Sequence, residues 1–232
     1  MVRHDLERRQ HGLGELSPAE QSAGQIDHVP GHESAAENDG AIYDTGTTIV
    51  ALEAGESVVM AADQRMSLGG RFTANKDVQK IERVHPTAAV AISGSVGPAQ
   101  AAVRSLRAEA DLYESRRGEP MTVTALARTA GRVVRGTRVT PLLAGVDASG
   151  PHVFELDGGG SVLADSYAAA GSGMQVAYGV LERRFDPEQS VAAATETATD
   201  AVRAASERDT ASGDGVTVAT ITDETVEIEE AS

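Results

Sequence analysis

The chain contains no cysteine and no tryptophan, and aromatic residues make up only 3% of its 232 positions. Without cysteine there is no disulfide, no thiolate nucleophile and no cysteine-ligated zinc or iron–sulfur site. Hydrophobic residues account for 41% of the chain, so a core can form, but with so few rings it must consist mainly of Ala, Val, Leu and Ile. The length suits one domain, or one domain plus a tail.

Long apolar runs and basic residues are also scarce. No run approaches the ~20 residues of a membrane-spanning helix, and the N-terminus lacks the apolar segment of a secretory signal. The 20 Lys and Arg stand against 35 Asp and Glu, which gives a net charge of −15. A polyanion binds nucleic acid poorly, because that affinity depends on neutralising phosphates. We expect a cytoplasmic protein with no membrane or nucleic-acid partner.

Lysine occurs only at Lys76 and Lys80, and every other basic residue is arginine. This preference, together with the acidic composition, resembles proteins from a high-salt cytoplasm, where carboxylate surfaces stay hydrated. A GC-rich genome that favours arginine codons explains the same pattern, and both causes can hold together. In either case, a chain that avoids lysine has two of them four residues apart.

The common catalytic and phosphate-binding signatures are missing. The sequence has no H-E-x-x-H, no P-loop, no G-x-G-x-x-G and no G-x-S-x-G. Beyond the first 46 residues the only histidines are His85 and His152, and neither follows a serine or aspartate motif that indicates a Ser-His-Asp triad. His85, beside Pro86, is expected in a surface turn. The sequence predicts no metal site and no cofactor.

The chain changes character abruptly at the Gly46-Thr47 bond. Residues 1–46 are polar, without helical or strand periodicity, and are predicted to be largely disordered. From Thr47 onward the chain reads at once as a β-strand. Such a boundary, with glycine directly before a hydroxyl side chain, indicates a cleavage site. We therefore expect a removable leader, residues 1–46, and a catalytic domain, residues 47–232.

Cleavage after Gly46 would give Thr47 a free α-amine. A threonine hydroxyl is a weak nucleophile unless a base is close, and the α-amine of the same residue can serve. Its pKa of about 7.7–8.0 is already near working pH, and a neighbouring ammonium group would lower it further. Lys80 is a candidate for that ammonium group, although a lone lysine is more often a surface charge. These residues predict a threonine-type, N-terminal-nucleophile hydrolase.

The order of the predicted elements fixes a fold class. Helices occur in consecutive pairs between groups of strands, which argues against a parallel βαβ sheet. We expect an α+β fold, a four-layer αββα sandwich of two antiparallel sheets flanked by helix pairs. The predicted strands are 47–52, 57–62, 88–92, 138–145, 151–155, 161–168, 216–222 and 225–228, and the predicted helices begin near 98, 122, 172 and 186.

Six segments in order resemble the β-type subunits of the 20S proteasome, most closely those of archaea, and the haloarchaeal type fits the acidic composition. The resemblance runs from Gly46 to the C-terminal hairpin. The segments are Gly46-Thr47-Thr48-Ile49-Val50, Ala61-Ala62-Asp63-Gln64-Arg65, Lys76-x-x-x-Lys80-Ile81, Ile92-Ser93-Gly94, Ala170-Gly171-Ser172-Gly173 with Gly179-Val180-Leu181-Glu182, and Arg208-Asp209-x-x-Ser212-Gly213.

This resemblance implies roles for individual residues. Thr47 would be the nucleophile, released when it attacks the Gly46 carbonyl and cuts the chain itself. Lys80 would tune its amine, and Asp63 would hold Lys80. The polar group that orients the amine would be Ser172, Asp209 and Ser212, although Ser172 is also a fair candidate for a helix N-cap. The Gly94 backbone N–H would form the oxyanion hole.

The resemblance also implies a substrate pocket and partners. The pocket positions are Met66, Val78, Ile92 and Val96, all apolar, so cleavage after hydrophobic residues of unfolded chains is expected. The partners would be further β subunits in a heptameric ring, α-type proteasome subunits and a proteasome-activating ATPase ring. No cofactor is implied.

Two departures from the family pattern leave alternatives open. Gly69-Gly70 looks like a one-residue insertion, which could bring Lys76 rather than Lys80 towards Thr47. Ile49 stands where Thr is common, and strand alternation predicts that its side chain shapes the pocket. Two other functions are a non-catalytic structural β-type ring subunit, which predicts loss of Thr47, Asp63 or Lys80, and the related bacterial two-ring peptidase, which lacks a long leader and the Arg-Asp-x-x-Ser-Gly segment.

Overall fold

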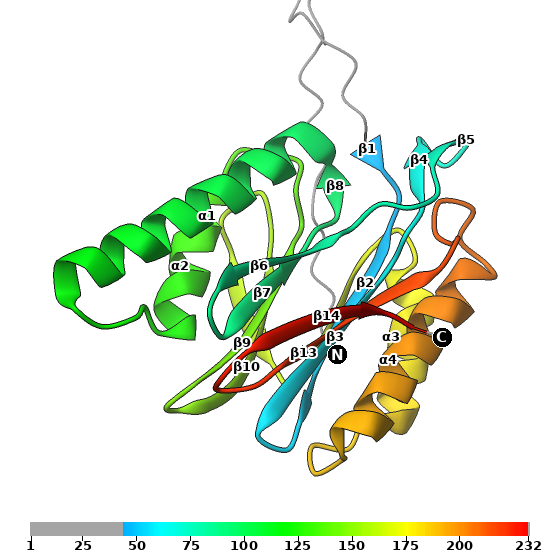
Figure 1. Cartoon of the computed structure of the whole chain (residues 1–232). Helices are drawn as coiled ribbons and strands as arrows, with labels where there is room; N and C mark the ends of the chain where they lie inside the picture. Colours follow the sequence, from blue (N-terminus) through cyan, green and yellow to red (C-terminus); the bar gives the residue numbers. More distant parts are fainter. Residues whose placement is uncertain (1–43, 232) are drawn as a thin grey trace, which may run out of the picture. The chain divides into compact units, whose positions relative to one another are not determined.

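The computed structural model describes residues 44–231, and within them two antiparallel sheets of five strands each pack face to face (Figure 1). The first sheet has the order β12 (Tyr167–Gly171), β2 (Thr48–Ala54), β3 (Ser57–Asp63), β13 (Val216–Ile221) and β14 (Val226–Glu230). The second has the order β11 (Val162–Asp165), β10 (Gly150–Leu156), β9 (Leu142–Asp147), β7 (Ala88–Ala91) and β6 (Ile81–His85).

A pair of helices covers the outer face of each sheet. Helices α1 (Val96–Arg117) and α2 (Val123–Val134) pack on β6, β9 and β10, whereas α3 (Met174–Arg184) and α4 (Val191–Ser206) pack on β2, β3 and β12. Thr122 caps α2, as its position in the sequence predicts, and Ser190 caps α4, each accepting a hydrogen bond from the backbone N–H three residues on. The predicted four-layer αββα fold is confirmed.

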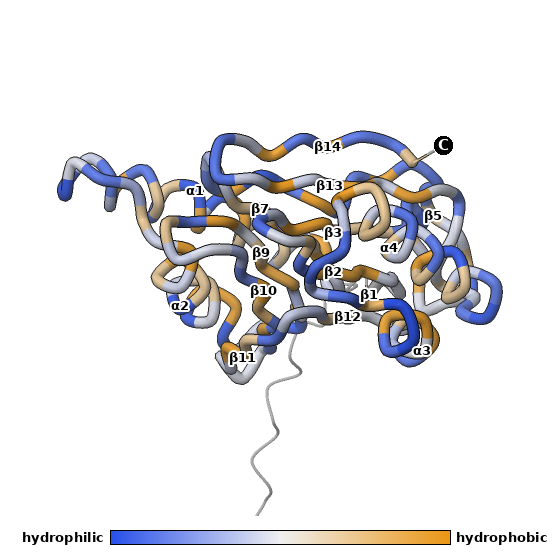
Figure 2. Tube along the Cα trace, turned by 90° about the horizontal axis from the view of Figure 1, so that it is seen from below, coloured by the Kyte–Doolittle hydropathy of each residue, from blue (hydrophilic) through white to orange (hydrophobic). Residues whose placement is uncertain are grey.

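Three hydrophobic clusters separate the four layers. The first lies between the two sheets and includes Ile49, Met60, Ile81 and Leu142, all with no exposed surface. The second lies between α1 and α2 and the sheet that β6, β7, β9, β10 and β11 form. The third lies between α3 and α4 and the other five-stranded sheet. Figure 2 shows the matching concentration of hydrophobic residues along β2, β3, β7, β9 and β13. As the composition requires, Ala and Val supply most of this packing.

The pairing of β2 and β3 with their neighbours brings several polar residues to one end of the sheet. Because the two strands are antiparallel, with Ile49 opposite Ala62, the start of β2 lies beside the end of β3. Strand β12 pairs with the other edge of β2 and places Gly171 opposite Thr48. Strand β13 pairs with β3 and places Val216 opposite Asp63. Residues from four distant segments therefore meet at one end of this sheet.

Some predicted boundaries are wrong. The stretch 161–168, predicted as one strand, divides at Ser166 into β11 and β12, which belong to different sheets. Helix α4 begins at Val191, not Asp186, because Gln189 N donates to Asp186 O and closes a turn around Pro187. The short hairpin of β4 (Met66–Leu68) and β5 (Phe72–Asn75) was not predicted.

The segment 1–46, predicted to be largely disordered, contains one short strand among its described residues. Residues 1–43 lie outside the described residues, but Asp44–Thr45 forms strand β1, which pairs antiparallel with β8 (Gly94–Ser95). In the part of the chain that the structure describes, no helix is long and apolar enough to cross a membrane.

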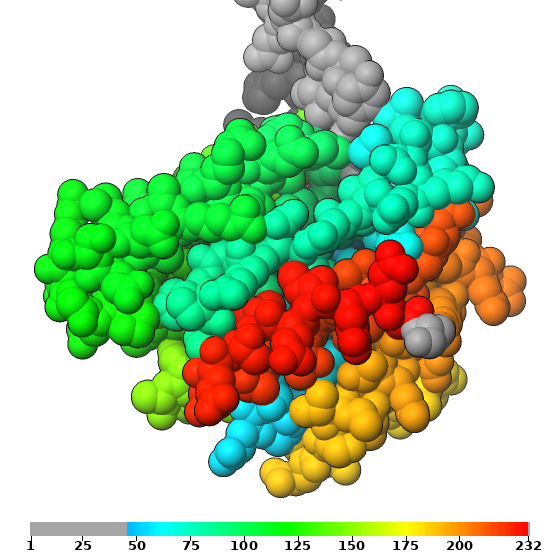
Figure 3. All heavy atoms as spheres, viewed as in Figure 1, coloured from blue at the N-terminus to red at the C-terminus, as the bar shows by residue number. Residues whose placement is uncertain are grey.

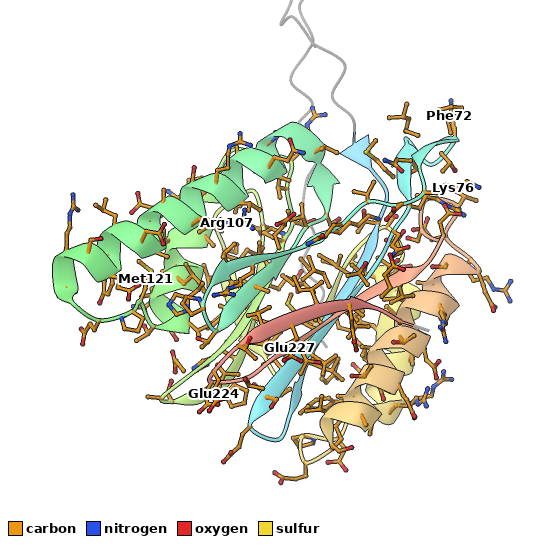
Figure 4. The ribbon with its side chains drawn as sticks, viewed as in Figure 1. Phe72, Lys76, Arg107, Met121, Glu224 and Glu227 are labelled. Carbon is orange, nitrogen blue, oxygen red and sulfur yellow. The ribbon has the colours of Figure 1, made fainter. Side chains whose placement is uncertain are left out.

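The C-terminal hairpin lies on the surface (Figure 3), with β14 at the open edge of its sheet. The exposed side chains of β14 are carboxylates, Glu227, Glu229 and Glu230, and Figure 4 shows Glu224 and Glu227 at this hairpin. Charged side chains on an edge strand oppose pairing with another chain.

Candidate active site

Thr47 is buried at the start of β2, with 1% of its surface exposed. Its backbone N–H donates to Ser172 Oγ at 3.1 Å, and its Oγ donates to the carbonyl oxygen of Gly46 at 2.7 Å. Gly171 allows this placement, because it has φ +94° and a Cβ there would lie 2.0 Å from Thr47 O. The hydroxyl and the backbone nitrogen of one residue therefore both face polar partners.

Asp63 and Lys80 form a buried ion pair next to Thr47. Lys80 Nζ donates to Asp63 Oδ1 at 2.7 Å, and the two side chains are 6% and 0% exposed. Asp63 also accepts the backbone N–H groups of Thr48 and Gly213, each at 2.9 Å, and of Arg65 at 3.2 Å. This carboxylate thus connects β2, the end of β3 and the loop before β13.

Burial dominates the electrostatics of this pair. It raises the pKa of Asp63 and lowers the pKa of Lys80, since each charged form loses hydration, and the attraction between the two groups opposes both shifts. The backbone donors from Thr48 and Gly213 further favour the carboxylate. Lys80 consequently loses its proton more readily than an exposed lysine does.

Ser172, Asp209 and Ser212 form one hydrogen-bonded network. Ser172 Oγ donates to Asp209 Oδ2 at 2.5 Å, and Ser212 Oγ donates to the same oxygen at 2.7 Å. Because Ser172 gives its proton to Asp209, its oxygen can accept from Thr47 N. Ser212 Oγ lies 2.8 Å from Thr48 Oγ, a contact that the sequence did not suggest.

The helix-cap interpretation of Ser172 is wrong. The N-cap of α3 is Gly173, without a side-chain cap, and Ser172 is committed to Asp209 and Thr47 instead. A Cβ on Gly173 would lie 2.0 Å from Thr48 Oγ, so the chain must approach closely here.

Two further glycines are restricted by their surroundings. Gly94 has φ +105°, and a Cβ there would lie 2.2 Å from Arg138 O. Thr45 is its partner in the pairing of β1 with β8. On Gly46 a Cβ would lie 1.9 Å from Ala211 Cβ, so only glycine fits directly before Thr47.

A pocket of about 360 Å³ opens beside Thr47 and Lys80. All four predicted residues line it, namely Met66, Val78, Ile92 and Val96. The sequence reasoning missed the polar side chains in the same lining, which are Gln79, Glu82, Gln100, Arg104 and Arg107. Arg107, on α1 facing β6 (Figure 4), pairs with Glu82 at 2.7 Å. The pocket is therefore apolar in part and charged in part.

The structure distinguishes the two lysines. Gly69 and Gly70 form the turn between β4 and β5 with positive φ values, and the hairpin also has a register shift between Met66 and Ser67. Lys76 follows β5 with its side chain 74% exposed and 3.9 Å from Asp214 (Figure 4). Lys80 is the lysine that reaches Asp63. Ile49 does not line the pocket as predicted, because its side chain lies in the core between the sheets.

Arg65 belongs to the surroundings of the site but was not singled out from the sequence. Its Nε donates to Asp214 at 2.7 Å, and its Nη1 donates to Thr210 O at 3.1 Å. These bonds tie the end of β3 to the loop that carries Asp209 and Ser212. Arg65 directly follows the Asp63-Gln64 pair, which was the available signal.

The two histidines of the described chain differ from expectation. His85 is only 8% exposed rather than on the surface, and burial lowers its pKa. His152 does lie near a serine and an aspartate, with Nε2 at 2.9 Å from Ser149 Oγ and 3.2 Å from Asp147 Oδ1. A catalytic triad needs both ring nitrogens, one for each partner, whereas here one nitrogen faces both. This cluster is not a triad.

No three His, Asp or Glu side chains among residues 44–231 gather in a way that could hold a metal ion. The polar groups around Thr47 are hydroxyls, carboxylates and one ammonium group that bond to one another.

The αββα sandwich, with threonine at the start of a central strand, is the fold class of the N-terminal-nucleophile hydrolases. The family model described as proteasome subunit matches residues 43–221. A proteasome subunit beta of Halorhabdus utahensis is 50% identical over 229 residues, covering 97% of this chain and 95% of that protein. One from Natronomonas pharaonis is 48% identical, covering 92% and 89%, and a proteasome subunit beta 2 of Haloarcula marismortui is 49% identical, covering 88% and 90%. The chain belongs to the proteasome subunit family, in its haloarchaeal β-type branch.

Proposed function

We propose that the chain is a catalytic subunit, a threonine endopeptidase with Thr47 as its nucleophile. The observation that carries the proposal is the environment of Thr47. Its nitrogen is bonded to Ser172 at 3.1 Å, its hydroxyl lies 2.7 Å from the Gly46 carbonyl oxygen, and the buried Lys80 lines the same pocket. A structural ring subunit would need none of these arrangements.

The first proposed reaction removes residues 1–46. Thr47 Oγ loses its proton and attacks the carbonyl carbon of Gly46. The C–N bond of the tetrahedral adduct then breaks as the Thr47 nitrogen takes up a proton, and water hydrolyses the resulting ester to a Gly46 carboxylate and the free Thr47 hydroxyl. In the intact chain Thr47 N is an amide nitrogen and cannot act as a base. Lys80 is the proposed acceptor of the hydroxyl proton, because burial lowers its pKa and the pocket places it beside Thr47.

The second reaction is peptide cleavage by the released Thr47. The α-amine takes the proton from Oγ, Oγ attacks the substrate carbonyl, and the protonated amine then gives that proton to the leaving nitrogen. Water, deprotonated by the same amine, then hydrolyses the ester on Thr47, which releases the acyl product as a carboxylic acid and restores the hydroxyl. Ser172 and Asp209 hold the amine, Ser212 holds Asp209, and Asp63 holds Lys80. The Gly94 N–H is the proposed donor to the oxyanion.

The geometry of the leader supports this proposal. Asp44–Thr45 lies as an antiparallel strand against Gly94–Ser95 and leads directly to the Gly46 carbonyl. An extended substrate can bind along the same strand by main-chain hydrogen bonds, whatever its sequence. Such binding suits an enzyme that degrades many unfolded chains.

The pocket is the proposed site of specificity. Met66, Val78, Ile92 and Val96 favour a hydrophobic side chain before the cleaved bond. Fluorogenic peptides ending in Leu, Tyr, Arg or Glu measure this, and faster cleavage after Arg or Glu would contradict it.

We further propose that the subunit works in the cytoplasm, in a heptameric ring with other β subunits, with α-type subunits and an ATPase ring that supplies unfolded polypeptides.

The test is the mass and N-terminal sequence of the subunit from the assembled core particle. The proposal predicts a mature chain that begins at Thr47, a Thr47→Ala variant that keeps its leader and cleaves no peptide, and a Thr45→Ala control that is processed normally. A full-length wild-type chain that stays inactive in the particle would instead establish the structural-subunit function.

A further inference from the structure

A second hollow, of about 550 Å³, lies beside the Gly46-Thr47 bond. Its lining includes Gly46, Ser93 and Gly94, the catalytic candidates Ser172 and Asp209, and three polar side chains without an assigned role, Arg138, Thr140 and Thr210. Gly94 lines both this hollow and the pocket that contains Met66 and Lys80. The two depressions therefore flank the bond to be cut.

The chemistry of cleavage decides which part of a substrate meets which depression. The amine of Thr47 must give its proton to the leaving nitrogen, so the leaving segment lies on the side of that amine. Thr47 N is bonded to Ser172 Oγ, and Ser172 lines the second hollow. The acyl side follows Asp44–Thr45 along β8 instead. The second hollow thus faces residues that come after the scissile bond.

The backbone at Arg138 is hydrogen-bonded to the strand β8 and its neighbours. The Arg138 carbonyl oxygen accepts Ser95 N–H at 2.9 Å, Thr140 N–H donates to Ser93 O at 3.0 Å, and Val139 forms a bridge with Gly94. The segment 138–140 is thereby tied to the strand that binds the substrate backbone. The guanidinium group belongs to an exposed residue and pairs with no carboxylate in the described part of the chain.

The charge balance of the hollow favours a negative group. Asp209 is the one carboxylate in its lining, and its oxygens already accept from Ser172, Ser212 and the backbone N–H of Ala211. Arg138 is the one basic side chain in the lining. A carboxylate that entered would meet an arginine fork able to bind it with two hydrogen bonds.

We propose that this hollow binds the substrate segment that follows the scissile bond, and that Arg138 selects for an acidic residue in that segment. The inference rests on the proposed function and adds a second specificity determinant to it. Substrates would be chosen by a hydrophobic residue before the cut and an acidic one shortly after it.

The experiment uses the assembled particle and internally quenched peptides. All have Leu before the scissile bond and differ only in the two positions after it, which carry Glu, Ala or Lys. Because exposed ion pairs contribute modestly, the wild type should show a kcat/KM about two- to fivefold higher with Glu than with Lys. Assays run at the lowest salt concentration that keeps the particle assembled, since salt screens the attraction, and mass spectrometry confirms the cleaved bond.

Variants separate this effect from catalysis. Arg138→Ala should bring the Glu-to-Lys ratio to about one, Arg138→Glu should invert it, and Arg138→Lys should keep it above one. Arg135→Ala, which removes the same charge from an exposed residue of the same loop outside the hollow, should leave the ratio unchanged. A coumarin peptide with no residue after the cut should be cleaved by Arg135→Ala at the wild-type rate, and its cleavage by the Arg138 variants reports that the particle is assembled and active.

The outcomes are distinct. A wild-type ratio near one, or a ratio that Arg138→Ala leaves unaltered while the coumarin peptide is still cleaved, overturns this inference alone. A wild-type particle that cleaves neither kind of peptide overturns the proposed function and this inference with it.

Discussion

At the scale of single residues, the site depends on one buried charge. Asp63 has no exposed surface and accepts hydrogen bonds from Lys80 and from three backbone N–H groups. A buried carboxylate without a counter-charge is costly, whereas a paired one is tolerated. Lys80 is therefore needed for stability as well as for the proposed chemistry.

Replacing Lys80 by Ala should lower the free energy of unfolding by about 3 kcal/mol, because it leaves the Asp63 charge buried and uncompensated. The measurement is urea unfolding in a Thr47→Ala background, in which processing cannot differ between variants. Lys76→Ala is the matched control and should change stability by less than about 0.5 kcal/mol, since the Lys76 side chain is 74% exposed. Equal losses for the two lysines would contradict the assignment of Lys80.

Some residues of the candidate site could be predicted from the sequence, and others could not. Thr47 could be predicted from the sequence as the candidate nucleophile, because cleavage before it would give one residue both a hydroxyl and an α-amine. Lys80 could be predicted because the chain otherwise avoids lysine. The contact of Thr48 Oγ with Ser212 joins residues 164 positions apart, and the position of Arg138 depends on loop geometry. No local pattern encodes such distances.

At the scale of elements, the start of α2 illustrates how a carboxylate at the end of a strand stabilises a helix. Asp147, the last residue of β9, accepts the backbone N–H of Val123 at 2.8 Å, and also the N–H and hydroxyl of Ser149. Burial raises the pKa of Asp147, but these donors and His152 outweigh burial and bring it down to about 2. The charged form is thus favoured in the folded state.

Asp147→Asn should accordingly reduce stability in a pH-dependent way. The folded pKa lies below the unfolded value of 3.8, so the contribution is complete above about pH 5 and is lost as the pH falls towards 2. Allowing for solvent screening, we expect a loss of about 1–2 kcal/mol at pH 6 that shrinks between pH 4 and pH 2. Urea unfolding over this range measures it, with the exposed Asp111→Asn on α1 as control. A loss that is constant with pH would contradict the prediction.

Helices and strands were predicted well where short-range sequence signals define them, and less well where the chain passes from one sheet to the other. The β2–β3 hairpin and the Thr122 cap of α2 follow from short-range signals. The stretch 161–168 is predicted as one strand because no glycine or proline interrupts it, although Ser166 is where the chain passes from one sheet to the other. Strands β1 and β8 have two residues each, too few for any periodicity.

At the scale of the whole molecule, the negative net charge lowers the stability of the folded state. The chain carries −15, and exposed carboxylates such as Glu224 and Glu227 gather at the C-terminal hairpin. Unscreened self-repulsion opposes the compact state. The screening length falls from about 10 Å at 0.1 M salt to about 3 Å at 1 M, so added salt should weaken that repulsion.

Raising KCl from 0.1 to 1 M at pH 7 should therefore increase the thermal midpoint by about 5 °C, equivalent to roughly 1–2 kcal/mol. Calorimetry or circular dichroism measures it. The same salt step at pH 5, close to the isoelectric point of about 4.7, is the control and should give a smaller gain. A midpoint that does not respond to salt at pH 7 would show that the carboxylates do not repel strongly.

Asp63 joins the beginning of the domain to its end, since Thr48 and Gly213 both donate to it, and Thr47 is held by the Ser172 that binds Asp209. Ribosomes make the N-terminal part first. The Gly46-Thr47 bond is thus synthesised early, while Asp209, Ser212 and Gly213 are among the last residues to emerge. Under the proposed function, a nascent chain therefore contains the bond to be cut before it contains Asp209 and Ser212, so the order of translation delays self-cleavage until that loop has been made.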